Sequence, residues 1–423
     1  MLLLEGGRVL CPDGGIDALR DVLIGDGQIV AVLLPGEGPA DVPRFPCHGR
    51  CIAPAFVDLA AQLGDPGFPW REDLASGSRA GAAGGFATLI SSPATLPVLD
   101  RGAIVDHLVQ RGRVAPGARV GVAGALTVGG LGQELAELGA LAAAGAVAYS
   151  DGGAPVADAG VLRRALEYAR PFGLPVIVRP GDPSLEQHGV MHEGVVSLSV
   201  GLRGVPEAAE EVGVTRVLAL ARATGARVHL SHVTTARAVA VLRAARAEGL
   251  PFTAAVPARH LLLTDAAVAD SGYETRFRLM PPLRPERDRL ALVRAVEDGV
   301  VDVVSPDHVP LGRVEKELEF QVAEPGAVGL ESAFSATYTA LAGDLEKTVR
   351  RLSLGPAAAL GLRPRVCPGA PADLVVLDTD WVGVFGAPIW SKGRAEPLQG
   401  LPGRGRVVAT FVGGRLAFDA AGR

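Results

Sequence analysis

Lysine is nearly absent from this sequence of 423 residues, where it occurs only at Lys316, Lys347 and Lys392. Aromatic residues make up only 4%, and neither charge is in large excess, because 41 Lys and Arg face 46 Asp and Glu for a net charge of −5. A chain so close to neutral lacks the broad basic surface that attracts a phosphate backbone, so nucleic-acid binding is not expected. No run of 18 apolar residues occurs, and the start MLLLEGGRVL has no basic leader region. We therefore expect a soluble, cytoplasmic protein that does not bind membranes.

Cysteine is also scarce, with four residues in the whole chain. Cys47 and Cys51 form a CxxxC pair with His48 between them, but no second pair or histidine cluster completes a zinc-finger spacing. We interpret the cysteines as reduced thiols that pack in the interior.

Apolar residues make up 48% of the chain and charged residues 21%, which are typical values for a folded globular protein. Between residues 56 and 306, short β-type runs alternate with alanine-rich stretches of helical spacing, which predicts a parallel sheet with crossover helices. Eight such units predict an α/β protein with a closed (β/α)8 TIM-type barrel. The eight predicted strands are Phe56–Leu59, Phe86–Ser91, Arg119–Val122, Ala146–Ser150, Val176–Arg179, Val228–His232, Phe252–Val256 and Val301–Ser305.

Short β-type runs separated by Gly, Pro and Asp turns lie on both sides of this region. They predict a small β-sandwich domain built from both termini, residues 1–53 and 365–423, beside a barrel domain of residues 54–364. The runs are Leu2–Leu4, Arg8–Leu10, Asp21–Ile24, Gln28–Leu33, Asp373–Leu377, Arg406–Val412 and Arg415–Phe418.

Three helices can be placed from their ends and composition. Arg71–Ala83 stops at two glycines, and Ala157–Pro171 has an acidic start and a basic end that suit the helix dipole. Gln133–Ala144 is apolar enough to pack on the barrel or to form a contact face, and the sequence does not decide between these alternatives.

The working residues of a βα barrel lie at the carboxyl ends of its strands and in the loops that follow them. Here those loops read DLAAQLGDPG, SSPATLP, SDGG, RPGDP, HVTT and PDHVP, and segments such as GVPEAAE, PPLRPERD and GAVGLES follow in order. Together these motifs resemble the cyclic amidohydrolases, and most of all the type I dihydroorotases of pyrimidine biosynthesis. The resemblance spans nearly the whole chain and implies a barrel with a split β-sandwich.

The resemblance also implies metal ligands, most of which are missing here. The family's HxH pair falls on Ala60 and Gln62, its strand-five histidine on Arg179, and its strand-four carboxylate on Gly152, with Asp151 one residue away. A methyl group and a guanidinium are not zinc ligands. His232 and Asp307 match the family and are the remaining weak metal candidates. With Asp151 they are interpreted as vestigial catalytic residues, so no metal or other cofactor is expected.

The family's substrate-binding positions differ as well. The arginine that follows the HxH pair is replaced by Gly64, two asparagines by Ala94 and Met280, and the histidine of the DHAPH-type motif by Leu311. A substrate carboxylate would therefore lack its guanidinium partner.

These departures predict a pseudoenzyme, a non-catalytic partner of the aspartate carbamoyltransferase catalytic chain in a hetero-oligomer, with homodimer contacts. Two alternatives remain open. One is an active zinc-dependent dihydroorotase, or another cyclic amide hydrolase, with a rearranged site of Asp151, Arg179, His232 and Asp307. The other is a binding protein for an intermediate such as carbamoyl aspartate, with Arg179 as the anion clamp.

The other candidate residues have plain structural interpretations. His229 and His260 lie beside apolar stretches and are predicted in the core or at its rim, and His308 is predicted to pack in a loop. His188 and His192 are four residues apart, but the glycine between them weakens a helical metal pair. Glu331 is predicted to fix a loop. Glu315 and Lys316 are predicted on a solvated helical face.

Overall fold

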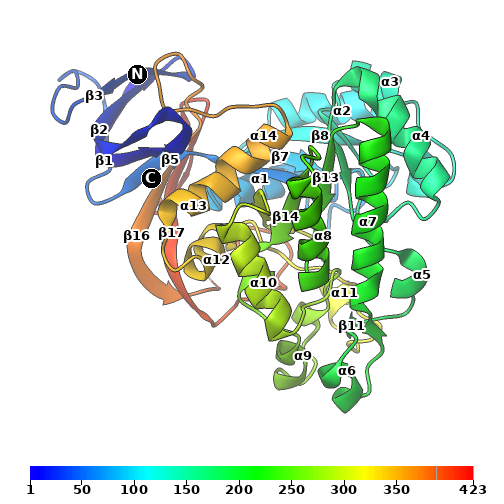
Figure 1. Ribbon diagram of the computed structural model, residues 1–423. Helices are drawn as coiled ribbons and strands as arrows, with labels where there is room; N and C mark the ends of the chain where they lie inside the picture. Colours follow the sequence, from blue (N-terminus) through cyan, green and yellow to red (C-terminus); the bar gives the residue numbers. More distant parts are fainter. Residues whose placement is uncertain (387, 423) are drawn as a thin grey trace.

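The computed structural model describes residues 1–386 and 388–422. Eight parallel strands follow one another round a barrel in chain order, which confirms the predicted (β/α)8 fold, and a β-sheet of both termini lies beside it (Figure 1). All eight predicted strands are present, with ends that differ by up to three residues. They are β6 (Phe56–Ala61), β7 (Phe86–Ser91), β8 (Arg119–Ala125), β9 (Ala148–Ser150), β10 (Val176–Val178), β13 (Val228–Ser231), β14 (Thr253–Pro257) and β15 (Val303–Ser305).

Small and branched side chains fill the interior of the barrel. One buried cluster takes residues from seven of the eight strands. Its strand members are Val57, Leu59, Ile90, Ala123, Ala148, Ile177, Ala255 and Val303. Three of these are alanine, so the strands close round a narrow packed core. The polar residues lie at the carboxyl ends of the strands.

Helices cover the outside of the barrel, and the longer ones pack their apolar sides on the strands through a second, larger buried cluster. The helices are α1 (Leu74–Ala83), α2 (Gly102–Arg113), α3 (Leu138–Ala143), α4 (Ala159–Ala169), α5 (Pro183–Glu186), α6 (Val195–Val200), α7 (Glu207–Thr224), α8 (Ala236–Ala247), α9 (Ala266–Asp270), α10 (Glu286–Glu297), α11 (Arg313–Lys316), α12 (Ala333–Ala340), α13 (Leu345–Val349) and α14 (Gly355–Ala359).

Two of the predicted helices are found with shorter ends, as α1 and α4. The third, Gln133–Ala144, is wrong over its first half, since only Leu138–Ala143 is helical. Thr127 forms an isolated antiparallel bridge with Leu135, and this pairing keeps Leu135 out of the helix.

The first and last barrel strands, β6 and β15, are not joined by a strand ladder in the described part of the chain. Other contacts close this seam. The amide of Gln62 donates to the carbonyl of His308 at 3.0 Å, and the Ser305 hydroxyl lies 3.4 Å from a carboxylate oxygen of Asp58. His308 is fully buried, with its Nε2 atom 3.6 Å from a carboxylate oxygen of the equally buried Glu72.

Glu315, in the short helix α11 that follows β15, also joins the two sides of the seam. Its carboxylate accepts hydrogen bonds from Trp70 Nε1 at 3.1 Å and Arg71 Nε at 2.7 Å, both in the loop after β6. We call these three residues the Glu315 clamp.

The two ends of the chain meet in one mixed sheet of eight strands. Its order is β18-β17-β16-β5-β1-β2-β3, with β4 paired to β1, and the N-terminal and C-terminal halves join where β5 pairs with β16. This confirms a terminal β domain, while its predicted limits at residues 53 and 365 remain predictions. The strands are β1 (Leu2–Cys11), β2 (Ile16–Gly25), β3 (Gln28–Leu33), β4 (Arg44–Pro46), β5 (Cys51–Pro54), β16 (Leu374–Val384), β17 (Pro402–Val412) and β18 (Arg415–Asp419).

Cys47 and Cys51 lie in the interior of this part of the protein as free thiols, as predicted, and His48 is exposed. Burial raises the pKa of both thiols to about 12, so they stay neutral and pack as small apolar groups. Across residues 1–386 and 388–422, no helix combines the length and the apolar character needed to cross a membrane.

Phe56 packs the first barrel strand against β7 and α12, and its removal is expected to lower the stability of the fold. The side chain is fully buried, and its ring centroid lies 5.6 Å from that of Phe86 and 5.8 Å from that of Phe334. We expect Phe56→Ala to lower the free energy of unfolding by about 3–5 kcal/mol, because it leaves a cavity. Urea denaturation measures this. The control Val314→Ala, at a side chain 85% exposed, is expected to change it by less than about 0.5 kcal/mol.

Candidate functional site

Four titratable side chains gather at the carboxyl ends of the barrel strands: Asp58 in β6, Asp151 after β9, His232 after β13 and Asp307 after β15. Each is between 2% and 8% exposed. Burial of a charge is unfavourable unless it is paired, so the partners of these groups decide which of them carry charge.

Asp307 lies between two basic side chains. One of its carboxylate oxygens is 3.6 Å from Nδ1 of His232, and the other is 3.6 Å from a guanidinium nitrogen of Arg259. Arg259 is itself 2% exposed and donates to the carbonyls of Pro306 and Asp307. Asp307 has a backbone φ of 50°, a left-handed conformation that Asp tolerates better than most residues and that recurs at functional sites.

His232 is held in its neutral form. Burial lowers its pKa, the nearby Asp307 opposes this shift, and Arg259 adds to it. Its Nε2 atom has no hydrogen-bond partner among the described residues. A neutral imidazole beside a carboxylate can pass a proton, so this pair has the chemistry of a general base.

Asp58 and Asp151 have pKa values shifted toward neutrality. Burial raises the pKa of Asp58 to about 6, with His308 and two backbone amides opposing the shift. Burial likewise raises the pKa of Asp151 to about 7, although its carboxylate accepts from the amides of Gly153 and Arg179. Carboxyl groups that titrate near pH 7 at the end of a barrel are candidates for proton transfer.

Arg179 lies at the end of β10 and is turned into an ion pair. Its two terminal nitrogens donate to the two carboxylate oxygens of Glu186 at 2.8 and 2.6 Å, and its Nε donates to the carbonyl of Gly153 at 2.7 Å. Both side chains are about 11–12% exposed. With its donors occupied, Arg179 holds the loop after β10 and is not a free clamp for an anion.

The positions at which the family holds its metal do not fit a metal ion in this chain. Ala60 brings a methyl group, Gly152 has no side chain, and the Arg179 guanidinium is neutralised by Glu186. Across residues 1–386 and 388–422, no group of three or more His, Cys, Asp or Glu side chains is placed to hold a metal ion. His232 and Asp307 lie together, but they do not form a complete ligand set.

The substituted substrate-binding positions are dispersed. Gly64 has a φ of 63°, and a Cβ atom there would lie 2.5 Å from the carbonyl oxygen of Glu72, so this backbone excludes any side chain. Ala94 lies next to Gly152 on the loop after β7. Met280 is half-buried, and Leu311 is buried in the loop after β15.

The other histidines follow their structural interpretations. His229 is buried and hydrogen-bonded to Thr253 at 2.8 Å, and burial lowers the pKa values of His229 and His260 to about 3. His188 and His192 form no helical pair, as the glycine between them indicated: His188 is exposed, and His192 is buried in β11 (Met191–His192).

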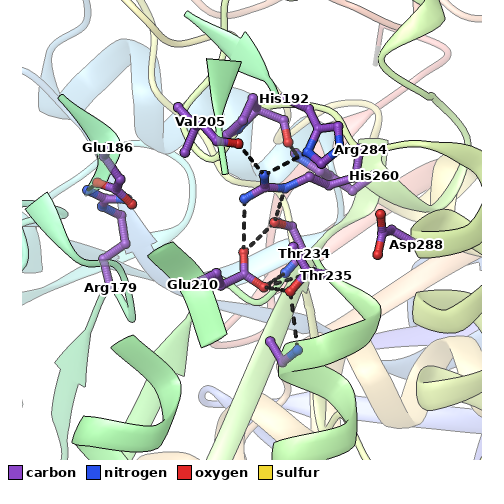
Figure 2. Close-up of polar contacts among 12 residues, drawn as sticks. Arg179, Glu186, His192, Val205, Glu210, Thr234, Thr235, His260, Arg284 and Asp288 are labelled. Carbon is purple, nitrogen blue, oxygen red and sulfur yellow. Dashed lines mark hydrogen bonds and ion pairs between the residues drawn. The ribbon is translucent and has the colours of Figure 1, made fainter. Parts of the chain in front are cut away.

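His192 belongs to a buried polar cluster built round Arg284 and Glu210, which Figure 2 shows beside the separate Arg179–Glu186 pair. Glu210 accepts hydrogen bonds from the amides of Thr234 and Thr235 at 2.7 and 2.8 Å, and lies 3.4 Å from Arg284. Arg284 also contacts His192 Nδ1 at 3.2 Å. The pairing ties the start of α7 to the loop after β13 and keeps the strand end that carries His232 in place.

The prediction that Glu331 fixes a loop is confirmed. One of its carboxylate oxygens accepts hydrogen bonds from the amides of Trp390 and Ser391. The prediction of a solvated face for Glu315 and Lys316 is wrong. Glu315 belongs to the Glu315 clamp, and Lys316 is only 9% exposed. The helix α11 has four residues, too few for its spacing to show which side faces water.

Sequence reasoning missed Asp58, Glu186 and Lys316. Asp58 stands inside a predicted strand and was passed over for the residues after it. Glu186 lies seven residues from Arg179 in a loop, and no periodic pattern links the two. The scarcity of lysine could have drawn attention to Lys316, since the chain has only three lysines.

A barrel with acidic and histidine side chains at its strand ends, beside a sheet made by both termini, is the architecture of an amidohydrolase-type protein. Solved structures agree on the fold. The L-hydantoinase (dihydropyrimidinase) from Arthrobacter aurescens superposes with a TM-score of 0.87 at 20% identity, covering 100% of this chain and 96% of that one.

Sequence comparison assigns the family. The family model described as "Dihydro-orotase-like" matches residues 49–238. Dihydroorotases of Anaeromyxobacter sp. (strain K) and Pelotomaculum thermopropionicum are 44% and 42% identical to this chain, over 99% of it and 98% of their own length. The dihydroorotase of Citrifermentans bemidjiense is 39% identical over 99% of this chain and 100% of its own. This chain belongs to the dihydroorotase family.

These comparisons correct two expectations. The non-catalytic scaffold is contradicted, because relatives 37–44% identical over essentially the whole length carry the name of the enzyme. The expectation that no cofactor is used is contradicted as well, because the family resemblance implies hydrolysis at a metal site. Both expectations were inferred from the substituted ligand positions, which do not by themselves show that the protein lacks activity or a cofactor.

The raised pKa of Asp151 predicts a pH-dependent effect of Asp151→Asn. Between about pH 4 and pH 7 the folded protein keeps the proton on Asp151 and the unfolded chain loses it, so this group's contribution to stability falls as the pH rises. The difference in stability between Asp151→Asn and the unmodified protein should therefore shift in favour of the variant when the pH is raised from 5 to 8. We expect this shift to be on the order of 1–4 kcal/mol. Thermal unfolding at both pH values measures this.

The matched control is Asp298→Asn, at a side chain 53% exposed. Its stability relative to the unmodified protein should not change between the two pH values. If the stability difference between Asp151→Asn and the unmodified protein is the same at both pH values, the conclusion that Asp151 titrates near neutrality is wrong.

Proposed function

We propose that the protein is a cyclic amidohydrolase that interconverts dihydroorotate and N-carbamoyl-L-aspartate, with a catalytic site rearranged from the usual pattern of its family. The observation that carries this proposal is the likeness to dihydroorotases, at 44% identity over 99% of the chain. The likeness takes in both the barrel and the terminal sheet, since it covers 99% of this chain and 98% of the relative, and this supports a shared reaction.

The hydrolysis joins water to the amide carbonyl carbon and breaks the ring C–N bond, and one proton of the water ends on the released nitrogen. A residue that accepts this proton and returns it contributes about 10²- to 10⁴-fold to the rate. In this barrel the best-placed group is Asp307, whose carboxylate faces His232 on one side and Arg259 on the other. Arg259 places a positive charge 3.6 Å from one of the Asp307 oxygens.

The neighbouring groups support this assignment. His232 is neutral and has an unpartnered Nε2 atom among the described residues, so it can accept a proton or orient a water molecule. Asp58, with a pKa of about 6, carries a proton for part of the time near neutral pH and can donate it to an oxygen that gains charge. Because the family's metal positions do not fit a metal here, no step is assigned to one.

Turnover by the purified chain tests the proposal. Dihydroorotate hydrolysis and N-carbamoyl-L-aspartate cyclisation are each measured with and without added zinc, alongside metal analysis of the same sample. We expect turnover in both directions, and Asp307→Asn is expected to lower kcat/KM by about 10²- to 10⁴-fold.

The surface variant Asp298→Asn is the matched control and should keep full activity. If the unmodified chain turns over neither compound with zinc present, the proposed function is wrong. If it turns over both while Asp307→Asn is equally active, the function stands and the role given to Asp307 is wrong.

Association with the aspartate carbamoyltransferase catalytic chain, and homodimer contacts, also belong to the proposal. A physical complex would place two enzymes of one pathway side by side. Sedimentation of the protein alone and mixed with that catalytic chain tests both. We expect a dimer alone and a faster hetero-oligomer in the mixture, and separate boundaries for the two proteins would rule out the complex.

A further inference from the structure

Two of the chain's three lysines, Lys316 and Lys392, line one cavity of about 450 Å³. The cavity is separate from the polar strand ends, since its described lining includes none of Asp58, Asp151, His232 and Asp307. Its walls come from the segments 273–276, 311–318 and 392–395, of which the first two follow strands β14 and β15. Pockets of roughly 300–1,000 Å³ are of the size that holds a small molecule.

The charge of this cavity is strongly positive. Its lining contains five basic side chains and two acidic ones. The basic residues are Arg276, Arg313, Lys316, Lys392 and Arg394, and the acidic residues are Glu274 and Glu317. A concave surface that carries an excess of one sign concentrates ligands of the opposite sign.

Three of the five cations already have carboxylate partners. Arg276 lies 2.6 Å from Glu274, Arg313 lies 2.7 Å from Glu317, and Lys392 pairs with Asp73. The two acids of the lining are therefore used up by two of its arginines.

Lys316 and Arg394 have no carboxylate partner within residues 1–386 and 388–422. The Lys316 ammonium group donates to the carbonyls of Arg278 at 3.3 Å and Glu324 at 3.0 Å, which accounts for two of its three N–H bonds. Arg394 donates to the carbonyl of Ile389 at 2.9 Å. Lys316 is 9% exposed, so it is a buried cation without an anion.

The surroundings of Lys316 make an anion favourable. Burial, together with the nearby arginines Arg278 and Arg259, lowers its pKa to about 7, against the opposing charge of Glu324. An anion in the cavity would offset this repulsion and accept the third N–H bond in a charge-assisted hydrogen bond.

We propose that this cavity is a binding site for a small dianion, a phosphate ester or a dicarboxylate, which Lys316 and Arg394 hold through its charged oxygens. The site takes part in no step assigned to the proposed hydrolysis, and of the substituted substrate-binding positions its wall includes Leu311. The Glu315 clamp adjoins it, since Gly312 of the cavity wall donates its amide to the Glu315 carboxylate.

Calorimetric titration with two probes, inorganic phosphate and succinate, tests the site in the full chain at pH 7. We expect at least one probe to bind the unmodified protein. Lys316→Met should weaken that binding by about 10- to 100-fold, because one charge-assisted hydrogen bond is lost. Phosphate binding alone identifies a phosphate ester as the ligand, and succinate binding alone a dicarboxylate.

Lys347→Met is the matched control, because this third lysine is 41% exposed, is paired with Asp344 and lies outside the cavity lining. It should bind the probe as the unmodified protein does. Lys316→Met removes a buried charge that has no paired carboxylate and lies near two arginines, so it should fold. Arg394→Gln, at an exposed position, provides a second variant and should also weaken binding.

Proton release or uptake gives an independent readout. A bound dianion raises the pKa of Lys316, so at pH 8 the amine takes up a proton on binding, and affinity falls as the pH rises above 7. Titration at pH 8 in buffers of different ionisation enthalpy measures the uptake, which should disappear in Lys316→Met. Failure of both probes to bind, or equal binding by Lys316→Met, would overturn the proposal.

Discussion

Burial at the carboxyl ends of the strands is the constraint on which the chemistry of this barrel depends. The eight strands converge on a narrow core, so the polar residues at their ends lie close together and away from water. A charge there must find a partner or be neutralised. Arg179 is paired with Glu186, Asp307 lies between Arg259 and His232, and the remaining carboxyl groups hold their protons up to near-neutral pH.

The same constraint explains how a family resemblance and a changed ligand set coexist. The barrel, its helices and the terminal sheet are stabilised by apolar packing, which the strand-end residues do not disturb. Substitutions at Ala60, Gln62 and Arg179 therefore change the local charge without changing the fold. Similarity to whole relatives supports the shared reaction, whereas the side chains at the strand ends show where its chemistry is rearranged.

The barrel strands could be predicted from sequence because each is a short apolar run followed by a polar loop, and both features are local. The partners of the polar residues could not. Glu186 reaches Arg179 through a loop, and the Glu315 clamp joins residues that are about 245 positions apart. Lys316 looked solvated because a four-residue helix gives no reliable period, and its burial depends on the segments packed around it.

The shielding of the strand ends has a consequence for speed. Asp307, His232 and Asp58 are each no more than 7% exposed, so the surrounding residues cover most of their surface. If a loop must move aside for a ligand to reach them, the Glu315 clamp is one set of contacts that this movement would break. Turnover then cannot be faster than this opening, and catalytic rates would report on loop motion as much as on bond cleavage.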